Sequence, residues 1–72
     1  MLEYKGFRIK PIETSPGRWR AKITCANGNK IKTFPDGAEY ESIDTGGMEF
    51  FSAEEAIEAA KQLIDGGGMA CD

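Results

Sequence analysis

The chain has 72 residues with two cysteines and no histidine, and its formal net charge at pH 7 is −3. This length allows one small domain with a single core. The absence of histidine removes the most common general base and metal ligand, which argues against ordinary hydrolytic and metal chemistry. With 40% hydrophobic and 29% charged residues, the composition is typical of a soluble globular protein, and no apolar run approaches the ~18 residues of a membrane span.

Positive and negative side chains are divided between the two halves of the chain. Residues 1–34 carry eight Lys and Arg against two Glu, whereas residues 35–72 carry ten acidic residues against Lys61 alone. A net-acidic chain therefore contains a strongly basic half, which is the most informative feature of its composition.

Residues 4–12 and 18–25 are predicted to form two β-strands joined by a Pro-Gly turn. In the first, Phe7 and Ile9 alternate with charged residues. The second alternates strictly, so it has one apolar and one mostly basic face. The apolar face consists of Trp19, Ala21, Ile23 and Cys25, and the other face of Arg18, Arg20, Lys22 and Thr24.

The loop that follows decides how the next strand pairs. A two-residue turn over the Asn-Gly pair would oppose Ile23 to Lys32 and mix the two faces. A three-residue loop ending in a left-handed Gly28 instead opposes Ile23 to Ile31 and Lys22 to Lys32. We favour the longer loop, because a slip of one residue is costly when one face is buried.

A turn is predicted at residues 35–37 and another at 44–47, which includes Gly46-Gly47. Residues 39–44 alternate weakly and are compatible with either a strand or a loop. Residues 48–51 form a short apolar stretch before the helix.

Residues 52–65 carry the clearest secondary-structure signal, that of a helix. Ser52 and Glu55 form a capping box, Phe51 is placed to pack against the first turn, and Gly66 ends the helix. Residues 67–72 are expected to be a flexible tail. The apolar stripe of the helix consists of Ala56, Ile57, Ala60, Leu63 and Ile64.

These elements predict an α+β fold, with a three- or four-stranded antiparallel sheet and one C-terminal helix packed on one face. We expect a single domain over residues 1–66. The sheet residues expected to face the helix are Phe7, Ile9, Trp19, Ala21, Ile23, Ile31 and Phe50.

The two cysteines are too few for a disulfide framework or a zinc site. Cys25 is expected to be a small core residue, and Cys71 a terminal thiol with an intermolecular disulfide as the alternative. The absence of a disulfide pattern and of a secretory signal predicts a cytoplasmic location. We expect no cofactor, no bound metal and no membrane association.

The opposite side of the sheet is predicted to be a basic face open to an anionic partner such as nucleic acid. Its candidate residues are Arg8, Lys10, Arg18, Arg20, Lys22, Lys30 and Lys32. Two alternatives remain open. Glu39, Glu41 and Asp44 can neutralise this face within the chain, or it can contact a protein, including the acidic helix of another copy. Tyr4 and Tyr40 are the candidates for exposed aromatic side chains.

The order of residues resembles two groups of DNA-binding domains. Residues 17–23 read Gly-Arg-Trp-Arg-Ala-Lys-Ile and are followed by an Asn-Gly loop and by the Phe-Ser and Glu-Ala pairs that open the helix. This is similar to the three-strand-plus-helix domains of plant ethylene-response factors and the arm-binding domains of phage integrases, and equally to small uncharacterised bacterial β-β-β-α proteins. The resemblance to the DNA-binding domains implies that the exposed sheet enters the major groove. The contacting positions would then be Arg18, Arg20, Lys22, Lys30 and Lys32.

No catalytic motif is found, because Ser52 serves as a helix cap and Cys25 has no neighbouring base. We therefore predict a non-enzymatic binding or accessory module, with protein interaction in a bacterial cytoplasm as the first hypothesis. Nucleic-acid binding through the basic face is the alternative.

Overall fold

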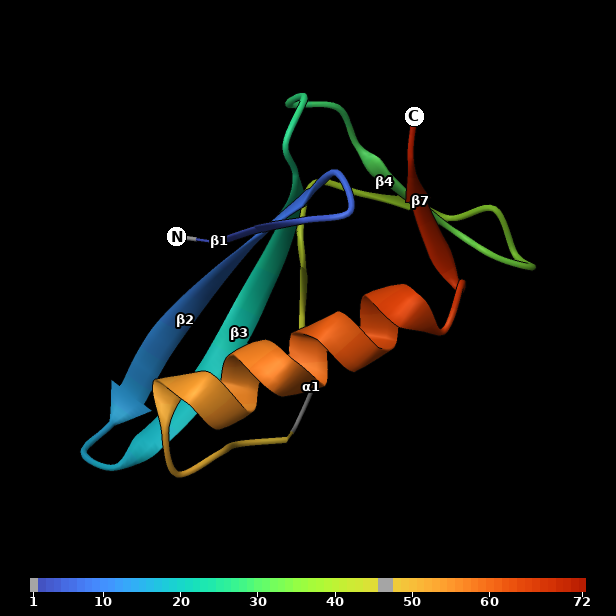
Figure 1. Ribbon diagram of the computed structural model, residues 1–72. Helices are drawn as coiled ribbons and strands as arrows, with labels where there is room; N and C mark the ends of the chain where they lie inside the picture. Colours follow the sequence, from blue (N-terminus) through green and yellow to red (C-terminus); the bar gives the residue numbers. More distant parts are fainter. Residues whose placement is uncertain (1, 46–47) are drawn as a thin grey trace.

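The fold is built from one helix and two antiparallel sheets, as Figure 1 shows for the computed structural model, which describes residues 2–45 and 48–72. The elements are β1 Leu2–Tyr4, β2 Phe7–Ser15, β3 Arg18–Cys25, β4 Ile31–Thr33, β5 Glu39–Tyr40, β6 Ile43–Asp44, α1 Ala53–Asp65 and β7 Met69–Cys71. The larger sheet has the strand order β1-β2-β3-β6 and the smaller one the order β5-β4-β7. The predicted α+β class is confirmed, although the strands divide between two sheets.

The core lies between α1 and one face of the larger sheet. The alternating apolar residues of β2 and β3 point to this face. Ile9 and Ile23 pair with each other across β2 and β3 and are completely buried. The buried side of the core consists of Phe7, Ile9, Ala21, Ile23, Cys25, Ile31, Ala56, Ala60 and Ile64. The predicted direction of the strand faces is therefore correct.

Trp19 extends this core toward the chain segment that leads into the helix. Its side chain is half-buried against the core, as the alternation predicts. Its backbone N–H donates to the Phe50 carbonyl at 2.7 Å, and the Phe50 N–H donates back at 2.8 Å. This exchange fixes the segment before α1 beside β3.

The start of α1 follows the sequence prediction in part. The Glu55 N–H donates to the Ser52 hydroxyl at 3.2 Å, so Ser52 is the helix cap. Phe51 does not pack against the first turn, because 84% of its surface is exposed. Leu63 is also outside the core at 44% exposure, since the buried stripe runs through Ala56, Ala60 and Ile64.

The predicted pairing of residue 23 with residue 31 is wrong. Ile23 pairs with Ile9 on one side and with Ile43 on the other, so β6 occupies the position expected for β4. The loop after β3 turns at Gly28, which has the predicted positive φ of 81°, but residues 29 and 30 then carry the chain away from the sheet. Ile31 is still completely buried, because it enters the core from β4 in the second sheet.

The segment from residue 35 to residue 47 contains the two short strands β5 and β6. Residues 35–37 contribute to the turn between β4 and β5, where the Gly37 N–H donates to the Thr33 carbonyl at 2.8 Å. The expected turn at Gly46-Gly47 lies outside the described residues.

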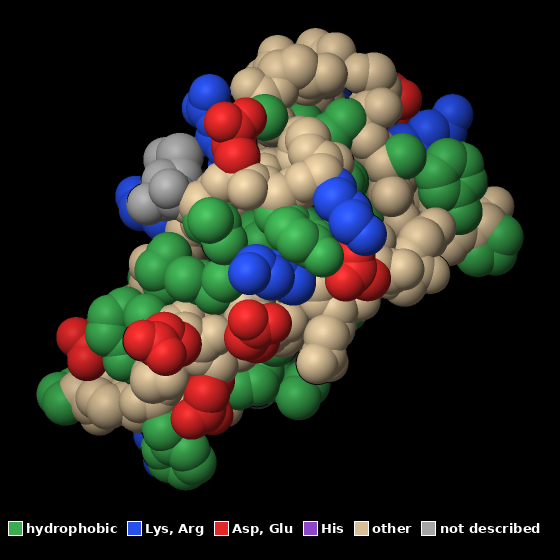
Figure 2. Space-filling model, viewed as in Figure 1, with side chains coloured by type: hydrophobic (Ala, Val, Ile, Leu, Met, Phe, Trp, Pro, Cys, Tyr) green, Lys and Arg blue, Asp and Glu red, His purple; other side chains and the backbone are tan. Residues whose placement is uncertain are grey.

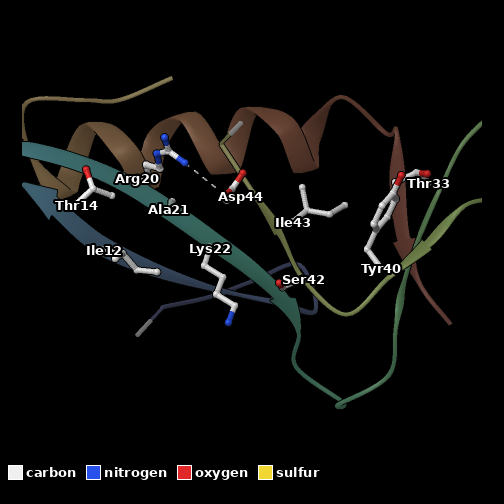
Figure 3. A pocket seen from close by; sticks show the side chains of 10 residues that line it. All are labelled: Ile12, Thr14, Arg20, Ala21, Lys22, Thr33, Tyr40, Ser42, Ile43 and Asp44. Atoms are coloured by element: carbon white, nitrogen blue, oxygen red, sulfur yellow. Dashed lines mark ion pairs between the residues drawn. The ribbon is translucent and has the colours of Figure 1, made fainter. Parts of the chain in front are cut away.

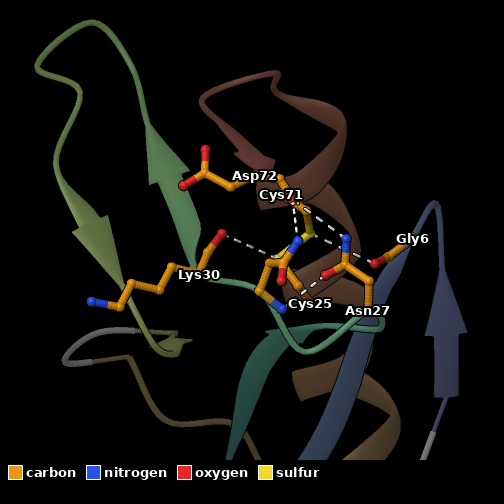
Figure 4. Close-up of a disulfide and its surroundings, with 7 residues drawn as sticks. Gly6, Cys25, Asn27, Lys30, Cys71 and Asp72 are labelled. Atoms are coloured by element: carbon orange, nitrogen blue, oxygen red, sulfur yellow. Dashed lines mark hydrogen bonds between the residues drawn. A yellow bond between two sulfur atoms is a disulfide. The ribbon is translucent and has the colours of Figure 1, made fainter.

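The carboxyl-terminal residues are not the flexible tail that the sequence predicts. β7 pairs with β4 in the register Ile31↔Cys71, and a disulfide joins Cys71 to Cys25 at the end of β3 (Figure 4). The Asn29 side-chain amide also donates to the Asp72 carbonyl at 2.6 Å. Cys25 is a core residue as predicted, but the expectation of two free thiols is wrong. Folding brings together two cysteines that lie 46 positions apart in sequence.

Among the described residues, α1 is too short and too polar to cross a membrane.

Candidate binding groove

The alternation of β2 and β3 directs their basic side chains away from α1. The basic residues on this outer face are Arg8, Lys10, Arg18, Arg20 and Lys22. The expected face also included Lys30 and Lys32, but these belong to the approach to β4 and to β4 itself, in the second sheet. The structure therefore brings together five of the seven candidates.

The exposed side of α1 has the opposite charge. Red acidic side chains lie along it in Figure 2. Glu54 and Glu55 are the acidic residues of its first turn. Because α1 covers one side of the larger sheet and the basic strand residues point to the other, the two charges are on opposite sides of the molecule.

Two of the five outer cations lie beside one carboxylate that was not identified from the sequence. Glu49 Oε1 lies 3.2 Å from Arg18 Nη1, and Glu49 Oε2 lies 3.8 Å from Arg20 Nε. A hydrogen bond from the Thr14 hydroxyl, at 2.7 Å, is the main cause that lowers the pKa of Glu49, followed by the hydrogen bond from Arg18. Glu49 is placed here by the backbone exchange between Phe50 and Trp19, a long-range contact without a local sequence signal.

The carboxylates expected to neutralise this face contribute less. Asp44 is the cross-strand partner of Lys22 and lies 3.9 Å from Arg20 Nη1, so it lies on a neighbouring strand against the basic residues as the alternative expected. Glu39 pairs with Lys32 in the second sheet, away from the outer face. Its own pKa is raised, chiefly by a hydrogen bond with Asp72.

Positive charge remains on the middle of the outer face. Lys10 and Lys22 are direct cross-strand partners, and Asp44 is the partner of Lys22 on its other side. Within the part of the chain that the structure describes, neither lysine forms an ion pair. Two like charges at such a site destabilise the pair by roughly tenths of a kcal/mol. Arg8 stands next to them, opposite Glu3 on β1. An anionic partner would relieve this local repulsion.

A groove of about 670 Å³ opens between this face and the second sheet, and Figure 3 shows the ten side chains that line it. Ile12 and Lys22 project from the larger sheet, while Tyr40 stands across the groove on β5. Ile43 points from β6 toward the second sheet, between these two sides. The groove thus joins an apolar surface to one of the cations that lack an ion pair.

Two exposed side chains, Ile12 and Tyr40, give the groove an apolar lining. Ile12 is 38% exposed and Tyr40 is 46% exposed, which confirms the expectation that Tyr40 is an exposed aromatic residue. The other candidate, Tyr4, is half-buried and donates a hydrogen bond to Asp65 at 2.9 Å. Ile12 was not identified from sequence as a surface residue, although the alternation places it on the same face as Arg8 and Lys10.

A scan against protein-family models, a search of curated proteins and a search of solved structures each found no match to this chain. The resemblance to DNA-binding domains therefore remains an expectation from sequence. Among the described residues, no three metal-ligating side chains gather into a cluster.

Proposed function

We propose that this protein is a small non-enzymatic binding module that holds a short segment of a partner protein in the groove between its two sheets. The observation that carries this proposal is the pair of apolar side chains, Ile12 and Tyr40, which line one hollow from different sheets and are both substantially exposed. A hollow of this size falls in the range of roughly 300–1,000 Å³ that is typical of ligand sites.

The outer face supports protein binding better than nucleic-acid binding. Nucleic-acid affinity depends on several cations that each contact a phosphate. Glu49 already pairs with Arg18 and Arg20, and the two candidates in the second sheet lie elsewhere. Arg8, Lys10 and Lys22 remain, which supports at most weak binding to nucleic acid with a shallow dependence on salt.

The open edge of β2 is a poorer docking site than the groove. Among the described residues, β1 pairs with residues 7–9 of β2, and residues 11–15 form an edge strand on that side. Pro11 lies in this stretch and has no backbone N–H to donate to an added strand. A partner that extends the sheet here would lose a hydrogen bond.

The cellular location is also a proposal. The expectation of a cytoplasmic location relied in part on the absence of a disulfide pattern, and the bond between Cys25 and Cys71 removes that reason. Disulfides persist in oxidising surroundings, so we infer an oxidising compartment. Alkylation of thiols in intact cells, followed by mass spectrometry, should find both cysteines unmodified. Two alkylated cysteines would contradict this inference.

Selection of peptides from a random display library on the immobilised protein tests the proposed function. The matched variants are Ile12→Ser, in the groove, and Phe34→Ser, at a side chain that is 51% exposed and does not line the groove. Enriched peptides should bind the Phe34 variant as they bind the natural protein and should lose about tenfold in affinity for the Ile12 variant. Equal binding to both variants would place the site elsewhere.

A further inference from the structure

We infer that the segment bound in the groove is acidic and carries one bulky apolar side chain next to its carboxylate. This inference rests on the proposed function and names the chemistry of its partner. Lys10 and Lys22, which form no ion pair among the described residues, and the apolar side chain of Ile12 beside them define this chemistry.

The charges around the groove determine whether the bound segment should be acidic or basic. Arg20 and Asp44 both line the groove, but their side chains point toward each other and are 3.9 Å apart, so their charges offset each other. Lys22 has no such ion pair among the described residues, and its cross-strand neighbours are Lys10 on β2 and Asp44 on β6. Because Asp44 also faces Arg20, the three cations Lys10, Arg20 and Lys22 surround one carboxylate, and the balance of charge here is positive. A carboxylate at the mouth of the groove would lower this repulsion, whereas a basic segment would increase it.

The apolar residues of the groove determine which type of partner side chain should lie next to the carboxylate. Ile12 lies two positions along β2 from Lys10 on the same face, and Arg20 is its partner on β3. Tyr40 presents its ring across the hollow, and Ile43 lies between the two sheets. A leucine, phenylalanine or tryptophan side chain placed against Ile12 removes its exposed surface from water, while Tyr40 is left at the far end of the hollow.

The hollow also limits how much of the partner it accepts. At about 670 Å³ it has room for a few side chains at a time. The occupant is therefore a short segment of a partner chain, with its carboxylate near Lys22 and its apolar side chain against Ile12, and the rest of the segment runs toward Tyr40.

Three peptide libraries of equal length test this inference on the disulfide-bonded protein. One fixes an Asp or Glu beside a Leu, Phe or Trp, the second replaces the acid by Lys, and the third replaces it by Gln. We expect enrichment from the acidic library, and binding that weakens about fivefold for Lys22→Gln and about tenfold for Lys22→Glu.

The matched control is Lys30→Gln, because Lys30 is an exposed lysine that does not line the groove. It should bind as the natural protein does, and circular dichroism should show that all variants are folded. Enrichment from the basic or neutral library, or unchanged binding by both Lys22 variants, would overturn the inference and leave the proposed function standing. No enrichment from any library would overturn both, as would tighter binding to a DNA duplex than to every peptide.

Discussion

The two sheets of this protein are held together in different ways. The larger sheet has its two long strands, β2 and β3, buried under α1, and its core contains the fully buried side chains Ile9 and Ile23. The smaller sheet consists of strands of two or three residues, with Ile31 as its fully buried residue. It is joined to the larger sheet by the Cys25–Cys71 disulfide.

This difference matters because the groove uses both sheets. Ile12 and Lys22 stand on the sheet that contributes most of the apolar core. Tyr40 stands on the sheet that contributes Ile31 to the core and that the disulfide joins to β3. The first side of the groove should therefore keep its structure under conditions in which the second side loosens.

Removal of the disulfide should have the largest effect. In the loop-entropy model, a bond that closes a loop of 46 residues stabilises the fold by about 4 kcal/mol. Cys71→Ser should therefore lower the free energy of unfolding by about that amount, as measured by urea denaturation. Amides of residues 69–71 should also exchange with solvent before those of β2 and β3. If the amides of both sheets exchanged equally slowly in Cys71→Ser, the smaller sheet would not need the disulfide more than the larger sheet does.

Truncation of buried isoleucines should have the next largest effect. Ile23→Ala leaves a cavity between the larger sheet and α1 and should cost about 3 kcal/mol. Ile31→Ala removes the same atoms from the smaller sheet, where the disulfide still restrains the chain, and should cost less. Urea unfolding of both variants in the oxidised state gives the two values. A greater loss of unfolding free energy for Ile31→Ala than for Ile23→Ala would contradict the view that the larger sheet carries the main core.

A fall in pH should have the smallest effect on stability, because it protonates two exposed carboxylates, those of Asp65 and Glu49. Hydrogen bonds from Lys5 and then Tyr4 lower the pKa of Asp65, and those from Thr14 and Arg18 lower the pKa of Glu49. Because both pKa values are lower in the folded protein, their stabilising effect is present above the unfolded values of about 4 and is lost as pH falls through the folded values.

Thermal unfolding between pH 6 and pH 3 measures this effect. The melting temperature should fall with pH, and the fall should be shallower for Asp65→Asn and Glu49→Gln. The control is Glu41→Gln, at an exposed carboxylate outside both clusters, and it should follow the natural protein. Identical profiles for all four proteins would show that these contacts do not stabilise the fold.

The sequence indicated the larger sheet and the helix because their signals are local. Strict alternation identified the faces of β3, and the Ser52 cap identified the start of α1. The pairing of β4 was wrong because Ile31 is buried equally well beside β3 or in a second sheet, and periodicity does not distinguish these. The disulfide was missed because two cysteines that are distant in sequence carry no spacing signal.

The candidate site was predicted less completely than the fold. Arg20, Lys22 and Tyr40 were identified by strand alternation and by composition. The role of Glu49 depends on the contact between Phe50 and Trp19, which only the folded chain makes. The groove itself arises from the division into two sheets, so no local pattern could reveal it.

Chemical-shift mapping by NMR tests the central claim most directly. A selected peptide with an acid beside an apolar residue is titrated into the isotope-labelled, disulfide-bonded protein. Our account predicts that the largest shifts occur at Ile12, Lys22, Tyr40 and Ile43, on both sides of the groove. Shifts concentrated instead on α1 or at the exposed Phe51 would contradict it.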